Sequence, residues 1–154
     1  MTNLAQEAEA FVTMKRRDGL PLGFRDKTEY AEFGYQLRSE VLRAGHREVQ
    51  VFLKGSAVTG YSYSTGRAFD GGSKPSDFDI AIVSPAMIKR ARKLRITLLS
   101  SGKRTVALNP DQLRQMGLRD TIDGLSTRQG RQVTIMIYES EGSVSRRSPF
   151  VRVP

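Results

Sequence analysis

Two short apolar runs constrain this chain more than any other feature, because residues that can carry chemistry stand at one end of each. The run VQVFL (49–53) is followed by Lys-Gly-Ser, and the run DFDIAIV (77–83) begins with two aspartates one residue apart. Short runs rich in β-branched residues, bounded by turn residues, predict buried strands. Because residues two apart on a strand point to the same face, Asp77 and Asp79 are predicted to project together.

The residues before the first run predict two helices. Leu4 to Arg17 is rich in helix formers, with acidic residues early and basic residues late. A second helix is predicted from a capping box at Asp26 to Glu29 until about Ala44, where Gly45 ends it. The apolar face of this helix is expected at four positions with helical spacing: Tyr30, Phe33, Leu37 and Val41.

The second half of the chain predicts further short helices and one more strand. Helices are expected at 85–94, 110–117 and 118–125, a turn at 100–105, and a strand at 132–138. This order of elements predicts an α+β fold in which helices flank a small mixed β-sheet.

The length of the chain predicts a single domain over residues 1–154. Within it we expect N-terminal helices at 1–45, a core at 49–138 and a loose tail at 139–154. The segment between the two apolar runs, 56–76, is rich in glycine, serine, threonine and tyrosine. It is long for a connection without a function.

Composition narrows the classes of function. Lys and Arg number 25 against 16 Asp and Glu, a net charge of +9, which favours polyanionic partners such as RNA, DNA, nucleotides or an acidic protein. The chain has no cysteine, which excludes disulfides and thiolate chemistry. The single histidine, His46, excludes a metal site built from histidines. No apolar run is long enough to span a bilayer.

The polar residues beside the strands are the candidate functional residues. Two carboxylates on one face repel each other unless a cation lies between them, and Mg²⁺ prefers a few carboxylates with waters and substrate phosphates. Asp77 and Asp79 are therefore candidate magnesium ligands, although an isolated pair of this kind is also common on a solvent-facing strand. Gly55 permits close backbone approach, and nearby N–H groups with the Ser56 hydroxyl can bind phosphate oxygens.

Three basic residues are further candidates for contact with a nucleotide. Lys54 directly precedes the Gly-Ser pair, so it can face a phosphate. Lys103 and Arg104 lie in the turn SGKRT, from which they could contact a nucleotide or RNA. That turn lacks the first glycine of a phosphate-binding P-loop, so a P-loop is rejected. Each of these residues fits a simple solvated surface as well.

Taken together, LKGSAVTG and SDFDIAIV resemble the signature of the nucleotidyltransferase superfamily that shares the core of DNA polymerase β, in its minimal form. The resemblance covers Val49 to Ser84. It implies a nucleotidyltransferase-like core in which Gly55 and Ser56 hold the β- and γ-phosphates of a nucleoside triphosphate (NTP). It also implies that Asp77 and Asp79 coordinate Mg²⁺.

The chain departs from the family's pattern at the third carboxylate. The family places this acid on a later strand, but VTIMIY has Thr134 and Met136 where it is expected. Glu139 follows at the end of that strand, and we expect it to substitute as the third catalytic acid.

A second resemblance extends over more of the chain. LPLGF, GSAVTGYSYSTG, FDGGSKPSDFDIAIV, SGKRT and VTIMIY are similar to C-terminal toxin modules of bacterial polymorphic and contact-dependent growth inhibition systems. The resemblance implies a secreted or delivered effector that acts in the cytoplasm of a target cell and is neutralised by a cognate immunity protein.

The two resemblances together predict a Mg²⁺-dependent toxin that transfers a nucleoside monophosphate from an NTP to an acceptor. The acceptor is expected to be tRNA first and protein hydroxyls second, because the basic charge favours RNA. Two alternatives stay open. One is a ribonuclease toxin, and the other is a noncatalytic RNA- or partner-binding module on a degenerate transferase fold.

Overall fold

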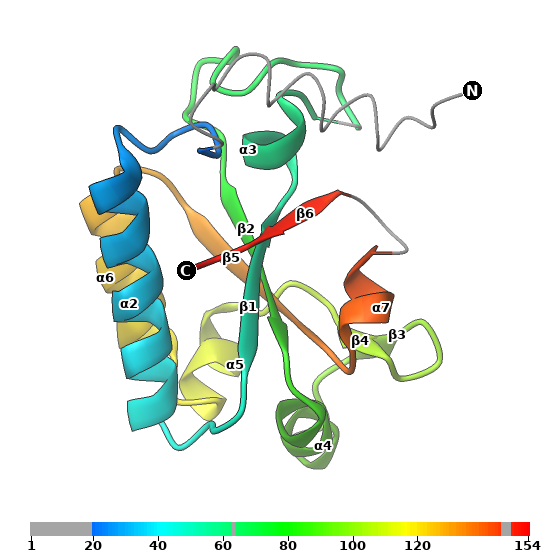
Figure 1. Ribbon diagram of the computed structural model, residues 1–154. Helices are drawn as coiled ribbons and strands as arrows, with labels where there is room; N and C mark the ends of the chain where they lie inside the picture. The colour runs from blue at the N-terminus through cyan, green and yellow to red at the C-terminus, as the bar shows by residue number, and fades with distance from the viewer. Residues whose placement is uncertain (1–19, 63, 146–148) are drawn as a thin grey trace.

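The computed structural model describes residues 20–62, 64–145 and 149–154 of the chain (Figure 1). Over these residues, six strands form one mixed sheet in the order β3-β4-β5-β2-β1-β6. The strands are β1 Gln50–Lys54, β2 Phe78–Val83, β3 Leu98–Leu99, β4 Arg104–Thr105, β5 Val133–Tyr138 and β6 Phe150–Arg152. The helices are α2 Lys27–Arg43, α3 Ser56–Thr59, α4 Pro85–Lys93, α5 Pro110–Gln115, α6 Arg119–Gln129 and α7 Glu141–Ser145. This is the predicted α+β fold, a mixed sheet with flanking helices.

The directions of the three central strands, β1, β2 and β5, determine which residues lie at each end of the sheet. Strand β2 pairs antiparallel with β1, so that Lys54 lies opposite Asp79. It pairs parallel with β5, so that Asp79 lies beside Thr134. The C-terminal end of β1 therefore lies beside the N-terminal ends of β2 and β5. We call this end of the strands the aspartate end, and its residues are Lys54, Gly55, Ser56, Asp77 and Asp79.

Helix α2 forms as its sequence predicts. The Asp26 carboxylate accepts a hydrogen bond of 2.8 Å from the backbone N–H of Glu29, which satisfies a free donor at the helix start. The Glu29 carboxylate reaches back to the N–H of Arg25, one residue before the position that a standard capping box uses. The buried residues include all four predicted ones, and Gly45 follows the helix in the left-handed conformation at φ 96°.

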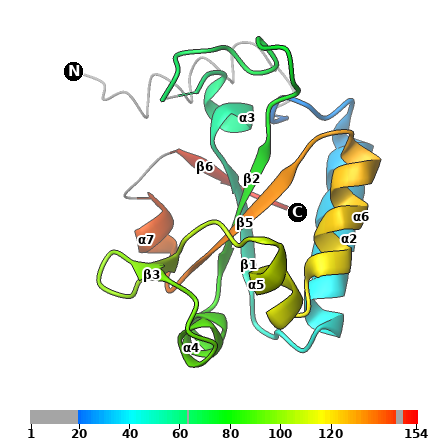
Figure 2. The ribbon, with the colours of Figure 1, turned by 180° about the vertical axis from the view of Figure 1, so that it is seen from behind.

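The sheet has apolar side chains on both faces. On one face Leu53, Ile80 and Ile135 belong to the main core, which α2 and α6 cover as neighbouring helices (Figures 1 and 2). On the other face Phe52 and Tyr138 form a smaller cluster with Val144 of α7. Phe78 and Ile80 lie in the main core, as the alternation of the second apolar run predicts.

Several elements differ from the prediction. The tail 139–154 is not loose over its described residues, because it contains α7 and β6, and β6 pairs antiparallel with β1. The turn expected at 100–105 covers only 100–103, which form the tip of a small hairpin, because Arg104–Thr105 are strand β4 and pair with β3. The connection that begins at Ser56 starts with the short helix α3. The helix expected over Leu4–Arg17 lies outside the described residues.

Among the described residues, no helix combines the length and the apolar character needed to cross a membrane.

Candidate functional site

The Gly-Ser turn and the aspartate pair meet at the aspartate end of the sheet. Gly55 has φ 81° and ψ −156°, a conformation that is essentially restricted to glycine. A Cβ atom added at Gly55 would lie 2.3 Å from the Oδ2 atom of Asp79, so the glycine backbone packs directly against this carboxylate. Helix α3 begins at the next residue, Ser56. Two segments that are separate in the sequence are thus in contact in the fold.

A row of polar side chains crosses the sheet at this end. Lys54, Asp79 and Thr134 occupy paired positions on three neighbouring strands, so their side chains share one face. The Thr134 hydroxyl donates a hydrogen bond of 2.8 Å to Oδ1 of Asp79. On β5 this threonine is the residue paired with Asp79, and it is one of the two positions, with Met136, at which the resemblance led us to expect an acid.

Asp77 and Asp79 lie close enough to affect each other. Both are partly buried, and Asp77 directly precedes β2. Burial raises the pKa of the Asp77 carboxyl, the negative charge of Asp79 raises it further, and the positive charge of Arg131 opposes both effects. The two carboxylates therefore repel each other, and a cation bound between them would reduce this repulsion.

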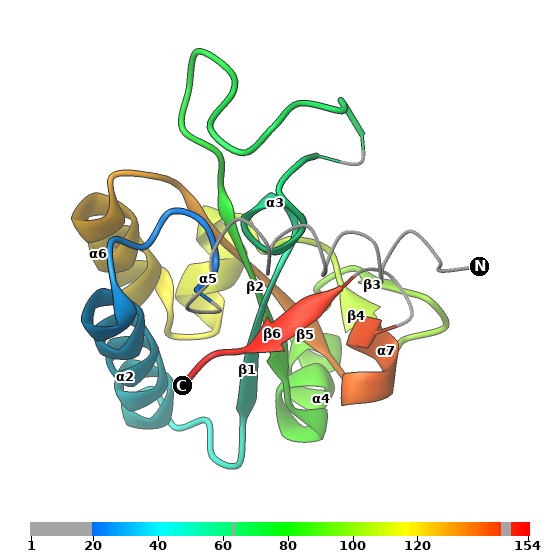
Figure 3. The same cartoon turned by 45° about the horizontal axis from the view of Figure 1, so that its top comes forward.

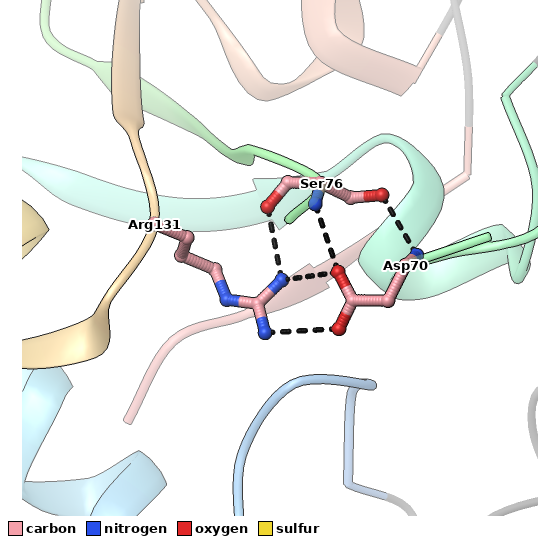
Figure 4. A network of polar contacts seen from close by, with 3 residues as sticks. All are labelled: Asp70, Ser76 and Arg131. Carbon is pink, nitrogen blue, oxygen red and sulfur yellow. Dashed lines mark hydrogen bonds and ion pairs between the residues drawn. The ribbon is translucent and has the colours of Figure 1, made fainter. Parts of the chain in front are cut away.

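Arg131 binds Asp70 and Ser76, two residues of the long segment between α3 and β2 (Figure 4). Its guanidinium makes two parallel hydrogen bonds to the carboxylate of Asp70, of 2.8 and 3.0 Å, and a third of 2.9 Å to the carbonyl oxygen of Ser76. Asp70 and Ser76 also bond each other twice, each through a backbone N–H and the other's side chain. Only 11% of the Arg131 side chain is exposed. These contacts fix the backbone immediately before Asp77.

We call Arg131 with its partners Asp70 and Ser76 the Arg131 clamp. Aromatic rings pack against its guanidinium from the side of the core. The Arg131 guanidinium carbon lies 4.8 Å from the ring centre of Phe69 and 4.9 Å from that of Phe78. Phe78 also stacks on Phe24 with ring centres 4.6 Å apart. A guanidinium over aromatic faces gains both electrostatic and packing energy. The start of β2 is therefore anchored from the core side, while its two aspartates remain partly exposed.

The segment that Arg131 clamps extends beyond the sheet edge, next to α3 (Figure 3). It begins after Gly60 and is tied back by hydrogen bonds from the N–H of Phe69 to Gly60 and from the N–H of Ser62 to Arg67. Residues 64–68 and 70–75 are exposed. The segment thus lies beside α3 at the aspartate end of the sheet.

Glu139 does not reach the aspartates. Strands β2 and β5 run parallel, with Asp79 beside Thr134, so Glu139 follows the opposite end of β5. At a rise of about 3.3 Å per residue, five residues of strand separate it from Thr134 by about 16 Å. Glu139 is exposed, and its N–H donates to the carbonyl of Lys103. The expectation that it completes a carboxylate triad at this site is wrong.

Lys103 and Arg104 are likewise far from the Gly-Ser turn. Arg104 pairs with Tyr138 at the end of β5, on the same side of the molecule as Glu139. Neither residue can therefore bind the phosphate group that Gly55 and Ser56 would hold. Of the basic candidates, Lys54 lies at the aspartate end.

In the ranges that the structure describes, no group of three or more His, Cys, Asp or Glu residues could hold a metal ion. The carboxylate donors at the aspartate end are thus the pair Asp77 and Asp79. Mg²⁺ is commonly held by one or two carboxylates, with substrate phosphates and waters as its other ligands. The pair matches that donor set and does not match a site made entirely of protein ligands.

Sequence reasoning missed the role of Arg131. It lies two residues before β5, in a turn that carries no motif, and its partner Asp70 is sixty-one residues away in the chain. The available signal was the sequence Asp70-Gly71-Gly72, a charged residue followed by two glycines inside the long connection. Asp70 has φ 58°, a left-handed conformation that aspartate tolerates better than most residues.

A groove lies on another part of the molecule, away from the aspartate end. The groove has a volume of about 850 Å³ and follows the exposed sides of α2 and α6, with Tyr35, Glu40 and Arg128 among its lining residues. It contains none of the candidate residues. Volume alone does not identify a site, and the chemistry is concentrated at the aspartate end.

The chain matches no model of a known protein family, no curated protein and no solved structure. A functional conclusion must therefore rest on the geometry of the site.

Proposed function

We propose that the protein is a Mg²⁺-dependent nucleotidyltransferase that moves a nucleoside monophosphate from an NTP to an acceptor hydroxyl. The observation that carries this proposal is the contact between Gly55 and Asp79. A turn able to bind phosphate and a carboxylate pair able to bind a divalent cation lie side by side, as a metal-bound triphosphate requires.

The Gly-Ser turn would bind the β- and γ-phosphates. Gly55 has no side chain to keep phosphate oxygens away from the backbone, and the first N–H groups of α3, before those of Val58 and Thr59 that donate to the Gly55 carbonyl, would donate to the phosphate. The Ser56 hydroxyl adds a further donor. Lys54, on the strand that leads into this turn, adds positive charge.

Asp77 and Asp79 would hold the metal ion. Bound Mg²⁺ would neutralise negative charge on the triphosphate as that charge develops. Thr134 keeps the Asp79 carboxylate oriented, because its hydroxyl donates to Oδ1. The Arg131 clamp keeps the backbone of Asp77 in place through Ser76.

The proposed reaction is an in-line displacement at the α-phosphorus. The acceptor hydroxyl oxygen forms a bond to the α-phosphorus, the bond between the α-phosphorus and the bridging oxygen breaks, and pyrophosphate leaves with that electron pair. The hydroxyl proton passes to water. Such catalysis is mainly positioning and electrostatics, so it requires no cysteine or histidine nucleophile.

RNA, with tRNA first, is the acceptor we propose, and protein hydroxyls are second. The support is the net charge of +9, which favours binding to a polyanion. The resemblance to toxin modules adds the proposal that the protein is a delivered effector, active in the cytoplasm of a target cell and bound by an immunity protein.

A labelling experiment tests the proposed reaction. The protein is incubated with Mg²⁺, one α-³²P-labelled NTP at a time, and either total bacterial RNA or an RNA-free lysate. We expect label on RNA with the wild-type protein and none with Asp77→Asn/Asp79→Asn, whose side chains keep their shape but lose their charge. Asp123→Asn is the matched control, because Asp123 is an exposed acid paired with Arg119 on α6.

The outcomes separate the rival functions. Label on protein in place of RNA changes the acceptor but keeps the reaction. RNA fragments without any label would replace the proposal by a ribonuclease. Label that persists in the double variant would contradict the proposed roles of the two aspartates.

A noncatalytic RNA- or partner-binding module is the second candidate. The observation that favours it is Thr134, a neutral hydrogen-bond donor at the position nearest to Asp79. In that case no labelled NTP yields a product, and Asp77→Asn leaves RNA or partner binding unchanged.

A further inference from the structure

A second charged region lies at the opposite end of the central strands from the aspartates. The segment 85–107 contains α4, β3 and β4 and carries no acidic residue. We call it the basic end, and its cationic side chains are Lys89, Arg90, Arg92, Lys93, Arg95, Lys103 and Arg104. In Figure 1, α4 and the β3–β4 hairpin lie away from α3, which marks the aspartate end.

The packing of α4 fixes the direction of its charges. Ser84 caps the helix, with its hydroxyl accepting from the N–H of Met87, and Met87, Ile88 and Ala91 are buried in the core. The remaining side of the helix faces solvent with four exposed cations: Lys89, Arg90, Arg92 and Lys93. Because the buried residues fix the rotation of α4 about its axis, the four cations stay on the solvent side.

The hairpin adds charge from another part of the chain to the same surface. The guanidinium of Arg92 lies against the hairpin tip, where a Cβ atom added at Gly102 would be 3.3 Å from its Nη2 atom. Lys103 follows this glycine and is exposed, and Arg104 is partly exposed. The surface is therefore built from two segments that the fold brings together.

In the part of the chain that the structure describes, no ion pair joins these cations to an acid, and the acid beside the hairpin is the exposed Glu139, whose N–H donates to the carbonyl of Lys103. The ion pairs found there use Arg25, Arg114, Arg119, Arg131 and Arg152, none of which belongs to the basic end. The helix dipole accounts for basic residues in the last turn of α4. It does not account for Lys103, which comes from the hairpin.

We propose that the basic end binds the phosphate backbone of an RNA double helix. Regularly spaced phosphates offer several negative charges to a surface of this kind, and binding releases the counterions condensed on the RNA. The surface lies about 16 Å or more from Asp79, since β2 separates them at about 3.3 Å per residue. Binding here needs neither NTP nor Mg²⁺, so it does not depend on the proposed reaction.

Fluorescence anisotropy with a labelled RNA hairpin, without NTP or Mg²⁺, tests this proposal. For Lys89→Gln/Arg92→Gln/Lys93→Gln we expect binding about 10-fold weaker or more, and a slope of log K against log salt reduced by about two. The matched control removes the same charge from the surface of α2 and α6: Lys27→Gln/Arg43→Gln/Arg128→Gln. We expect its affinity to fall by about threefold or less, since only the long-range field changes.

The comparison decides between a local site and net charge. Equal losses in the two triple variants would overturn the proposal, as would an unchanged affinity in the first. Preferential binding of a polyglutamate peptide over the RNA would assign the surface to an acidic protein and overturn it too. A DNA hairpin of the same sequence serves as the second nucleic acid, and binding of DNA without binding of RNA would contradict the assignment to RNA.

Two further variants keep the result interpretable. Lys89→Arg/Lys93→Arg preserves the charge and is expected to retain binding, so a loss there would argue against a phosphate contact. Asp77→Asn/Asp79→Asn is expected to bind the hairpin as well as the wild type while it loses nucleotide transfer. If transfer is absent from the wild type but the hairpin binds at the basic end, the proposed function fails and this inference stands.

Discussion

The two ends of the central sheet carry charge in different ways. At the aspartate end Arg131 is almost buried and is matched by two hydrogen bonds to Asp70, while Asp79 receives one from Thr134. At the basic end, the exposed cations of α4 have a neighbouring basic hairpin and no acid in their own segment. Charge at the first end is positioned by specific partners, whereas charge at the second is spread over a surface.

This difference separates two kinds of recognition. Fixed geometry with paired charges suits a small ligand whose atoms must be held in one arrangement. A surface of unpaired cations suits a long polyanion, for which total charge matters more than the place of each contact. Substitutions at the aspartate end should therefore act through geometry and stability, and those at the basic end through affinity and salt dependence.

The largest loss of stability is expected for Gly55→Ala. The φ and ψ of Gly55 cost about 1–3 kcal/mol for a residue with a side chain, and the new Cβ would overlap Asp79 Oδ2. Overpacking adds about 1–3 kcal/mol. We expect a decrease of about 3 kcal/mol in the free energy of unfolding, measured by urea denaturation.

Gly45→Ala is the matched control for this substitution. Gly45 has φ 96° but no atom within 4 Å of an added Cβ, so only backbone strain is introduced. We expect a decrease of about 1 kcal/mol. Equal losses of stability at the two glycines would show that the contact of Gly55 with Asp79 adds nothing to backbone strain. The aspartate end would then not be packed more closely than the surface around Gly45.

Arg131→Gln is expected to have the next largest effect. Its guanidinium is nearly buried and supports Asp70 and Ser76 at once, so its removal should cost about 2–3 kcal/mol of stability. The released segment should also be cut faster by trypsin after the exposed Arg67. Arg114→Gln, which removes an exposed ion pair with Asp111, should change stability by about 0.5 kcal/mol or less. Similar losses in both would argue against the clamp.

The clamp also predicts a dependence on pH. The hydrogen bonds from Arg131 lower the pKa of Asp70 below its usual 3.8, because they favour the charged carboxylate. The stability that this pair contributes is present above pH 3.8 and is lost as the pH falls through the lowered value. The difference in melting temperature between wild type and Arg131→Gln should therefore narrow in acid. A constant difference across this range would exclude ionised Asp70 as the partner.

Much of this architecture could be predicted because the signals were local. Asp26 and the helical spacing of Tyr30 and Phe33 define α2 without reference to other segments. Alternation at the start of 77–83 predicts the buried Phe78 and Ile80, and the fully apolar residues that follow are buried on both faces of the sheet. The resemblance implies that Gly55 and Ser56 bind the phosphates of the NTP whose Mg²⁺ is held by Asp77 and Asp79, so the two segments were expected near each other, but the direct contact of Gly55 with Asp79 was not predicted.

The errors came from information that no short segment contains. Whether β5 runs parallel or antiparallel to β2 decides whether its end or its start lies beside Asp79, and the residues of VTIMIY do not encode that direction. Glu139 was misplaced for this reason. Helix α7 and strand β6 are too short to be predicted from propensity, because they form against Tyr138 and along β1.

A smaller effect is expected for Thr134→Val, which keeps the shape of the side chain but removes the donor to Asp79. The lost hydrogen bond should reduce the free energy of unfolding by about 1 kcal/mol and should lower any transferase activity by disordering the carboxylate. Thr127→Val on the exposed side of α6 is the control. Full activity in Thr134→Val would mean that this threonine only fills the place of an acid.

The smallest effect, and the one opposite in sign, is expected for Asp77→Asn. Burial and the charge of Asp79 raise the pKa of Asp77, so its ionised form destabilises the folded state once the pH rises above the ordinary value of 3.8. The asparagine removes this repulsion, and we expect a slightly higher melting temperature at pH 7 that converges with the wild type at pH 3. Added Mg²⁺ should raise the melting temperature of the wild type and leave that of the variant nearly unchanged. A lower melting temperature for Asp77→Asn at pH 7 would mean that the charged aspartate stabilises the fold. The repulsion between Asp77 and Asp79, which we expect at a site for a cation, would then be absent.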